Sequence, residues 1–462
     1  MKFEDYIEKL KKHSVGVIGI GVSNTPLINT FLKYGIKVTA YDKRSFYELD
    51  DRAKKFAGEQ NVELVLGNDY LDNLHNEILF RTPGLMPFEE HLQKAASKGC
   101  TITSEMEAFF EVCPCHTIAV TGSDGKTTTT TIINELLKQE GYITHIGGNI
   151  GNPLFSEASQ FNENDYAVLE LSSFQLHSMK CAPEIAVITN ISPNHLDKHK
   201  DFQDYIDAKK NIFINQNNSD TLILNANDAM TDYYQRKASS KIHYFARDKE
   251  INNGIFSFNG EVYASMQPRE KRQFLLNTDS IIIPGSHNIE NYLAAFAATY
   301  GLISNDTRLY ITSTFKGVEH RLEKVRELNG VTFINDSIGT SPTRTIAGIR
   351  AVKTKPILIA GGYDKHIPFD GLGDVICKDC KALILTGDTS EKIYKAVTNS
   401  KYYTPKSLKI EFAESLKDAV IKSCSIAEKG DIVLLSPACA AFDRYKNFME
   451  RGKDYKNIIN SL

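Results

Sequence analysis

The sequence predicts an α/β protein of three domains: a Rossmann-like N-terminal domain, a central P-loop-type ATPase domain with a mostly parallel sheet, and a Rossmann-like C-terminal domain. At 462 residues the chain is too long for one core of ordinary size. Short apolar β-runs alternate with Gly-rich turns and helical stretches from end to end, which is typical of parallel sheets. One of these runs is followed by a phosphate loop, Gly122-Ser-Asp-Gly-Lys-Thr127.

Each predicted domain is recognised by its own elements. The first, residues 1–98, opens with the β-run and glycine turn Val15-Gly-Val-Ile-Gly-Ile-Gly21. The second, residues 99–312, holds the phosphate loop. The third, residues 313–462, repeats the strand–turn–helix pattern with β-runs at 331–335, 356–360, 382–385 and 431–435.

Composition argues against several classes of protein. Acidic and basic residues nearly balance, 57 against 54, so no net field favours nucleic acid or an anionic membrane. No apolar run approaches the roughly 18 residues of a membrane helix. The stretch from Met1 to Lys12 is charged and does not resemble a signal peptide. We expect a cytoplasmic monomer with small-molecule substrates, without nucleic acid or membrane insertion, and with its eight cysteines reduced.

The phosphate loop lies between a buried-type strand, Thr117–Thr121, and a helix. Backbone N–H groups in such a turn, together with the helix N-terminus, bind phosphate. A plain connection would explain the glycines but not the five β-branched residues 127–131, which are poor helix formers. We therefore predict an ATP site at Gly122, Ser123, Asp124, Gly125, Lys126, Thr127 and Thr128. Lys126 supplies a cation and Thr127 a hydroxyl for Mg²⁺.

Two other apolar strands end in groups that could complete this site. Tyr166-Ala-Val-Leu-Glu170 places a carboxylate at a strand end, where open parallel sheets bind ligands. Glu170 is thus a candidate Mg²⁺ ligand, and the alternative is a solvated carboxylate. The next strand runs into a loop with His195, and we interpret this histidine as a group near the phosphates or, alternatively, a surface residue.

A lysine lies on the apolar face of the helix predicted over 201–214. Helical periodicity puts Lys209 at the centre of the stripe formed by Phe202, Tyr205, Ile206, Ile212 and Phe213. A buried ammonium must pair with an acid, lose its proton or be modified. Carbamylation by CO₂ would make it an anion able to bind Mg²⁺. The alternative is a lysine that only packs its stem.

Together these motifs resemble those of a known family, the Mur ligases of peptidoglycan synthesis. The resemblance rests on Thr121-Gly-Ser-Asp-Gly-Lys-Thr-Thr, Leu169-Glu-Leu-Ser-Ser-Phe-Gln and Asn190-Ile-Ser-Pro-Asn-His-Leu-Asp-Lys-His. Gly317-Val-Glu-His-Arg and Leu434-Leu-Ser-Pro-Ala-Cys-Ala-Ala-Phe-Asp are similar to the member that joins D-glutamate to UDP-N-acetylmuramoyl-L-alanine. The resemblance spans all three predicted domains.

The resemblance implies an ATP-dependent ligase reaction through an acyl phosphate, with ATP as co-substrate and two Mg²⁺ ions. Lys126, His195 and Lys209 would be the catalytic residues. Thr127 and Glu170 would hold one metal, and His195 and carbamylated Lys209 the second.

The resemblance also implies substrate contacts, position by position. ATP would further contact Asn288, Arg321 and Asp336. The UDP substrate would lie against Val22, Ser23, Asp42, Arg44 and Asn149. D-Glutamate would be held by Thr340, Lys365, Phe442 and Phe448. Lys365 also makes sense on its own, because a dicarboxylate needs a fixed cation. Ile338 and Ala441 depart from the commonest family residues, Lys and Ser, which leaves the details of the glutamate pocket open.

Three alternatives stay open. Gly19-Ile-Gly21 with Asp42 is a partial dinucleotide fingerprint, in which Asn24 replaces the third glycine, and alone it permits an NAD-dependent oxidoreductase. Within the ligases, another Mur-type or a folate-polyglutamate enzyme is possible. A non-catalytic nucleotide-binding protein would need the phosphate loop but neither Glu170 nor Lys209.

Overall fold

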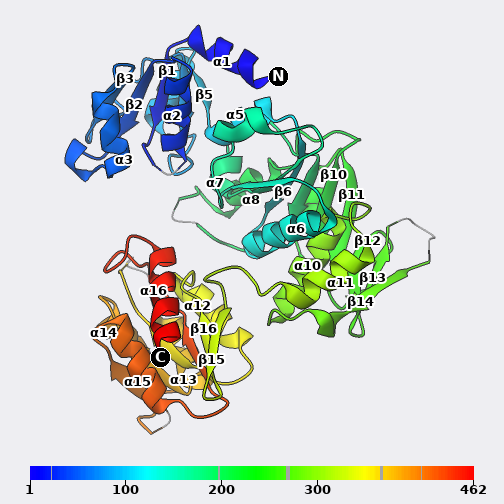
Figure 1. Cartoon of the computed structure of the whole chain (residues 1–462), viewed down its shortest axis with the longest axis vertical. Coiled ribbons are helices and arrows are strands. Elements are labelled where there is room, and N and C mark those ends of the chain that lie inside the picture. The colour runs from blue at the N-terminus through cyan, green and yellow to red at the C-terminus, as the bar shows by residue number, and fades with distance from the viewer. Residues whose placement is uncertain (22, 196–197, 267–270, 365–367, 407) are drawn as a thin grey trace. The chain divides into compact units, whose positions relative to one another are not determined.

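The computed structural model describes residues 1–21, 23–195, 198–266, 271–364, 368–406 and 408–462. The chain divides into two compact units: residues 1–280 with 287–313, and residues 281–286 with 314–462. The first unit contains a five-stranded and a nine-stranded sheet, and the second a six-stranded sheet (Figure 1). These mostly parallel sheets with helices confirm the predicted α/β fold class. The division into domains at residues 98 and 312 stays a prediction.

The five-stranded sheet is parallel throughout, with the order β3-β2-β1-β4-β5. This is the order of a Rossmann sheet, in which ligands bind at the carboxyl ends of the strands. Its strands are β1 (Val15–Ile18), β2 (Val38–Asp42), β3 (Val62–Leu66), β4 (Ile78–Arg81) and β5 (Thr101–Thr103). The accompanying helices are α1 (Phe3–Lys11), α2 (Asn24–Lys33), η1 (Phe46–Glu48), α3 (Asp51–Lys54), η2 (Lys55–Gly58), α4 (Glu90–Ser97) and α5 (Glu105–Val112).

The nine-stranded sheet has the order β14-β13-β12-β11-β10-β9-β6-β8-β7, parallel except at β13 and β14. Its strands are β6 (His116–Thr121), β7 (Thr144–Gly148), β8 (Tyr166–Glu170), β9 (Ile185–Ile188), β10 (Thr221–Asn225), β11 (Lys241–Ala246), β12 (Gly254–Phe258), β13 (Glu261–Ser265) and β14 (Gln273–Asn277). Its helices are α6 (Lys126–Glu140), η3 (Phe155–Gln160), α7 (Ser173–Leu176), α8 (Phe202–Lys210), α9 (Thr231–Gln235), η4 (Thr278–Ser280), α10 (Ser286–Ala298) and α11 (Asn305–Thr314).

The register of this sheet brings three chain turns to one edge. Val120 of β6 pairs with Glu170 of β8 on one side and with Val187 of β9 on the other. Because all three strands are parallel, the phosphate loop after β6 lies between the segments that follow β8 and β9.

One hydrophobic cluster runs from the five-stranded sheet into the nine-stranded sheet. At its centre is the fully buried ring of Phe155, which contacts Phe3 and Tyr6 of α1 and Phe31 of α2, with centroids 5.3, 5.6 and 6.0 Å away. Shared apolar burial of this kind is what makes the two sheets one compact unit.

The second unit is built on a sheet of order β15-β16-β20-β17-β18-β19, antiparallel only between β15 and β16. Its strands are β15 (Glu323–Leu328), β16 (Val331–Asn335), β17 (Ile357–Ala360), β18 (Ala382–Leu385), β19 (Lys409–Phe412) and β20 (Ile432–Leu435). Its helices are α12 (Pro342–Ala351), α13 (Asp370–Asp379), α14 (Ser390–Thr398), α15 (Leu416–Ile426) and α16 (Phe448–Ser461).

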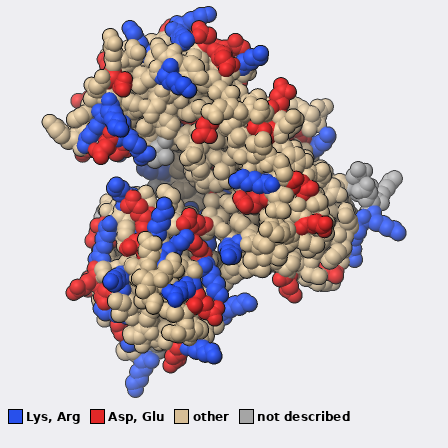
Figure 2. All heavy atoms as spheres, in the orientation of Figure 1, with Lys and Arg blue, Asp and Glu red and all other residues tan. Residues whose placement is uncertain are grey.

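On the face shown in Figure 2, basic and acidic side chains are interspersed. Across the described ranges, every helix is too short or too polar to cross a bilayer.

Candidate active site

The phosphate loop has a backbone that only glycine adopts without strain at two positions. Gly122 and Gly125 have φ of 146° and 80°. A Cβ on Gly122 would lie 1.9 Å from Thr189 Oγ1, and one on Gly125 would lie 2.3 Å from Asn291 Oδ1. The glycines thus allow the loop to pack against the segment after β9 and against α10, and Gly125 caps the start of α6.

Hydrogen bonds fix the loop to the segment that follows β9. Ser123 Oγ lies 2.9 Å from the carbonyl of Ser192 and 2.9 Å from the hydroxyl of Tyr205. The amide of Asp124 donates to Asn190 Oδ1 at 2.9 Å, and Thr189 Oγ1 donates to the Asp124 carbonyl at 2.6 Å. Sequence reasoning named Ser123 and Asp124 but missed the partners that hold them in place.

Two lysine amines lie on this loop. Lys126 Nζ donates to the carbonyls of Gly122 and Ser123 at 3.0 and 2.9 Å. Lys209, which is 1% exposed, donates to the Gly122 carbonyl at 2.8 Å and to Thr121 Oγ1 at 3.2 Å. Burial, with the charge of Lys126 next in importance, lowers the pKa of Lys209 well below its ordinary value. The predicted inward orientation of Lys209 is what the structure has, and α8 ends at Lys210, short of the predicted residue 214.

Glu170 lies at the end of β8 with its carboxylate buried. Its Oε1 accepts a hydrogen bond of 2.7 Å from Asn149 Nδ2. Its Oε2 is buried with no hydrogen-bond partner in the described part of the chain. A buried carboxylate oxygen without a donor is unfavourable unless a ligand completes its shell. The structure also brings together Asn149 and Glu170, which the sequence had assigned to different ligands.

His195 lies on the loop after β9 and is exposed, with its ring 5.1 Å from that of Phe174. Its loop is anchored by His199, which is 3% exposed. Burial lowers the pKa of His199, so its imidazole is neutral at neutral pH. Nδ1 therefore donates to Asp204 at 2.7 Å, and Nε2 accepts from Ser173 Oγ at 2.9 Å. These bonds tie the loop to α7 and α8.

Asn288, the predicted adenine contact, is buried on α10. Its side-chain oxygen accepts from Asn291 Nδ2 at 2.9 Å, and Asn291 Oδ1 accepts from Thr129 Oγ1 at 3.3 Å. Asn291 thus connects Asn288 to α6 and contacts the loop at Gly125. The sequence signal that could have found Asn291 is its spacing of three residues from Asn288, which places both on one helix face.

Of the predicted UDP residues, Ser23, Asp42 and Arg44 lie at the carboxyl edge of the five-stranded sheet, whereas Asn149 follows β7 of the nine-stranded sheet. Arg44 forms a two-bond ion pair with Asp42, at 2.9 and 2.8 Å. Burial alone would raise the pKa of Asp42, but bonds from Arg44 and Ile20 hold it below its usual value. Ser23 directly precedes α2 and makes no side-chain capping bond, and Asn24 donates to the carbonyls of Ile18 and Gly19 at 3.0 Å. Val22 lies outside the described residues.

In the second unit, Asp336 follows β16 and is 5% exposed. Its carboxylate accepts from Ser436 Oγ at 2.6 Å and from the Leu322 amide at 3.3 Å. Burial raises the pKa of Asp336 to about 6.

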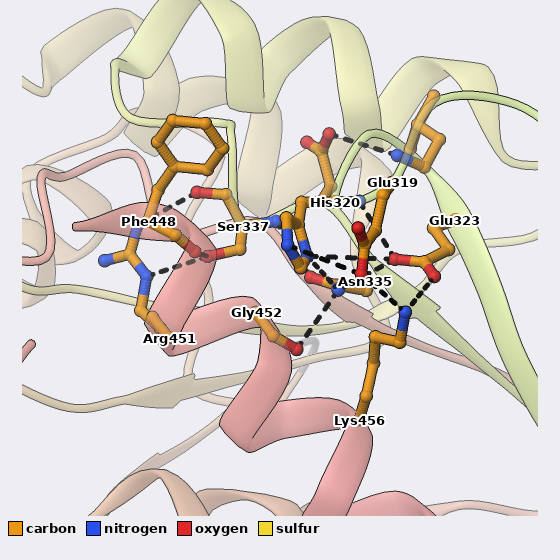
Figure 3. Close-up of polar contacts among 11 residues, drawn as sticks. Glu319, His320, Glu323, Asn335, Ser337, Phe448, Arg451, Gly452 and Lys456 are labelled. Carbon is orange, nitrogen blue, oxygen red and sulfur yellow. Dashed lines mark hydrogen bonds and ion pairs between the residues drawn. The ribbon is translucent and has the colours of Figure 1, made fainter. Parts of the chain in front are cut away.

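The segment before Arg321 is fixed by a polar cluster (Figure 3). Asn335 Nδ2 lies 3.0 Å from His320 Nδ1, and Lys456 of α16 bonds Glu319 and Glu323 at 2.9 and 2.6 Å. Gly452 is required beneath the imidazole, since a Cβ there would lie 2.3 Å from His320 Nδ1.

Two of the predicted D-glutamate residues, Thr340 and Phe442, lie outside the helices and strands of the second unit. Thr340 precedes α12, and its amide donates to the Ile338 carbonyl at 2.7 Å. Phe442 is 63% exposed, with its ring 5.9 Å from that of Tyr363. Phe448 begins α16. Ala441 is buried. Lys365 lies outside the described residues.

Comparison with known proteins shows which family the sequence matches. The Mur ligase middle domain matches residues 120–299, and the Mur ligase, glutamate ligase domain matches residues 320–439. A UDP-N-acetylmuramoylalanine–D-glutamate ligase of Acetivibrio thermocellus is 46% identical over 100% of this chain and 99% of its own. One of Clostridium beijerinckii is 47% identical over the same shares.

Solved structures share the fold. UDP-N-acetylmuramate-alanine ligase MurC of Thermotoga maritima aligns with 97% of this chain and 99% of its own, at a TM-score of 0.59 and 18% identity. MurF of Acinetobacter baumannii aligns with 78% of this chain and 82% of its own, at a TM-score of 0.57 and 18% identity.

Lys209→Met is expected to stabilise the protein in buffer free of nucleotide, Mg²⁺ and CO₂. The folded state disfavours the charged amine, so the pKa of Lys209 is lower in the folded than in the unfolded chain. The wild type is therefore destabilised at pH values below the unfolded pKa, and its stability increases as pH rises toward 10.5. At neutral pH the variant should gain at least about 1 kcal/mol in urea unfolding, since replacing a buried charge by an apolar side chain is often stabilising. The gain should shrink as pH rises.

Lys210→Met, at the less buried neighbouring lysine, is the control and should show no such pH-dependent gain. A Lys209→Met variant less stable than the wild type at every pH would contradict this account.

Proposed function

The chain belongs to the Mur ligase family, and we propose that it is the member that joins D-glutamate to UDP-N-acetylmuramoyl-L-alanine in the synthesis of peptidoglycan precursors. ATP is the co-substrate, and ADP and phosphate are the products. The main support is identity of 46% along the full chain to ligases named for this reaction. The chain's own chemistry agrees, because a phosphate loop, a buried carboxylate and a buried amine meet at one sheet edge.

The proposed reaction has two steps. An oxygen of the substrate carboxylate attacks the γ-phosphorus of ATP and ADP leaves, giving an acyl phosphate. The amine of D-glutamate then attacks the acyl carbon, phosphate leaves, and a proton is released. The first step brings two anions together, so it needs positive charge held in place before the reaction. We propose that the loop amides and Lys126 supply this charge to the phosphates.

The residues at this edge also fit a Mg²⁺ ion. Glu170 Oε2 is buried without a hydrogen-bond partner among the described residues, as expected of a carboxylate oxygen that serves a cation. We propose that Thr127 and Glu170 hold one ion, and His195 with a carbamylated Lys209 a second. Bound Mg²⁺ would reduce the repulsion between carboxylate and phosphate.

The remaining contacts are proposed from the family match. Asn288, Arg321 and Asp336 would bind the nucleotide, and Ser23, Asp42, Arg44 and Asn149 the UDP substrate, with Val22 as a further contact. Thr340, Lys365, Phe442 and Phe448 would bind D-glutamate. We place the enzyme in the cytoplasm, where ATP and UDP-linked precursors are available. All the proposed residues belong to one chain, so we propose a monomer; a dimer in sedimentation of the active protein would contradict this.

The reaction is tested by phosphate release from ATP with Mg²⁺, UDP-N-acetylmuramoyl-L-alanine and a panel of amino acids. Release is expected only when both the UDP substrate and D-glutamate are present. Release with a different amino acid would identify another Mur-type ligase. No release with any amino acid, despite ATP binding, would favour a non-catalytic nucleotide-binding protein.

Glu170→Gln is expected to raise the Mg²⁺ concentration for half-maximal activity by at least about tenfold, because an amide oxygen binds this ion more weakly than a carboxylate. The substitution preserves the size of the side chain and an oxygen for Asn149. Glu184→Gln, at an exposed carboxylate of the same unit, is the matched control and should leave the Mg²⁺ titration unchanged. An unchanged titration in Glu170→Gln would remove this residue from the metal site.

Carbamylation of Lys209 is tested by intact mass under native conditions with bicarbonate. CO₂ adds only to a neutral amine, which burial favours here, and the new N–C bond releases a proton to solvent. The active protein should be heavier by one CO₂, and Lys209→Met should lose this increment whereas Lys210→Met keeps it. An unmodified mass in fully active protein would disprove the carbamate.

A further inference from the structure

Arg451, one turn into α16, is a buried cation that the chemistry above does not use. It is 4% exposed, and within the described ranges no carboxylate lies within ion-pair distance of it. Burial lowers the pKa of Arg451 to about 10, which leaves it charged at neutral pH. The charge of Asp443 opposes this fall without forming a direct ion pair. A buried charge without a direct ion pair is costly unless hydrogen bonds satisfy it.

The guanidinium is satisfied by two chain segments, and Figure 3 shows its bonds to the first of them, at Ser337. Its Nε and Nη2 donate to the hydroxyl and the carbonyl of Ser337, just after β16, at 3.1 and 3.0 Å. Its Nη1 and Nη2 donate to the carbonyls of Ala440 and Cys439, just after β20, at 3.0 Å. Four bonds from one planar group thus join the segments after two neighbouring strands.

The segment after β20 adopts a conformation that requires such support. Ala438 has a φ of 59°, a left-handed conformation that is unfavourable for alanine. On its other side, the Pro437 carbonyl accepts from the Gly361 amide at 2.8 Å, and the Ala440 carbonyl also accepts from the Tyr363 amide at 3.0 Å. The chain is buried as far as Ala441 and emerges at Phe442.

The same group controls the start of α16. Ser337 Oγ, which accepts from Arg451, donates to the Phe448 carbonyl at 2.8 Å. Phe442 and Phe448 are the two aromatic residues proposed to contact D-glutamate. The backbone segments that carry them are both connected to one guanidinium, Phe442 through Cys439 and Ala440, and Phe448 through Ser337. The carboxylate of Asp336, proposed to bind the nucleotide, is held by Ser436 and Leu322, and neither of these residues bonds Arg451.

We infer that Arg451 is a positioning residue for the amino-acid substrate: by joining the segments after β16 and β20 it sets the backbone from which Phe442 and Phe448 reach D-glutamate. This inference rests on the proposed function. Lysine cannot replace the guanidinium, because its donors radiate from one atom and do not reach acceptors on both segments.

Arg451→Lys is the test, read from the KM of each substrate. The KM of D-glutamate is expected to rise by at least about tenfold, while those of ATP and the UDP substrate change by less than about threefold. Arg326→Lys is the matched control, because Arg326 also bonds carbonyls of α16, at Ile459 and Asn460, but at the opposite end of the helix. It should change no KM by more than about twofold.

An unchanged KM of D-glutamate in folded Arg451→Lys, or an equal rise in all three KM values, would overturn the inference. If this variant does not fold, Ser337→Ala decides, because it removes one guanidinium bond and the bond to Phe448. A rise of about two- to fivefold in the KM of D-glutamate supports the inference, and no rise overturns it. Wild-type protein that releases no phosphate with D-glutamate would disprove the proposed function before any variant is measured.

Discussion

The burial of the Lys209 amine against the Gly122 carbonyl is the constraint on which the nucleotide site depends. An amine at this depth is stable only where acceptors are fixed in advance, and here they are the loop itself and Thr121 at the end of β6. The same packing requires glycine at 122, since a side chain there would collide with Thr189. The unmodified amine of Lys209 is unfavourable for folding, which is expected of a residue whose role is chemical and not structural.

The second unit also contains buried ionisable side chains that are held by hydrogen bonds to fixed polar groups. Asp336 and Arg451 are both buried and both ionisable, and their partners are hydroxyl, amide and carbonyl groups. Opposite charges act on both groups as well, because Arg321 and Arg344 oppose the rise in the pKa of Asp336, and Asp443 opposes the fall in that of Arg451. Fixed hydrogen bonds and nearby charges thus stabilise the two buried groups together.

Periodicity and strand ends were sufficient to predict the parts of the site that are local in sequence. The apolar stripe of α8 located Lys209, and the end of β8 located Glu170, because both signals depend on a few neighbouring residues. The anchors were not predictable in this way. Thr129 and Asn291 are 162 residues apart, and Arg451 is 114 residues from Ser337. Arg451 also lies in a largely polar helix, where a charged residue is expected to face solvent.

The helix after the phosphate loop has a consequence for how the site is stabilised. Its first turns are the threonine run 127–131, whose intrinsic preference is not helical, and three of these threonines are buried. The first turns of the helix therefore take their stability from tertiary contacts with β6, β7 and β8. The phosphate site at its N-terminus consequently depends on the pairing of strands that are distant in sequence, and ATP bound there would stabilise the pairing as well as the loop.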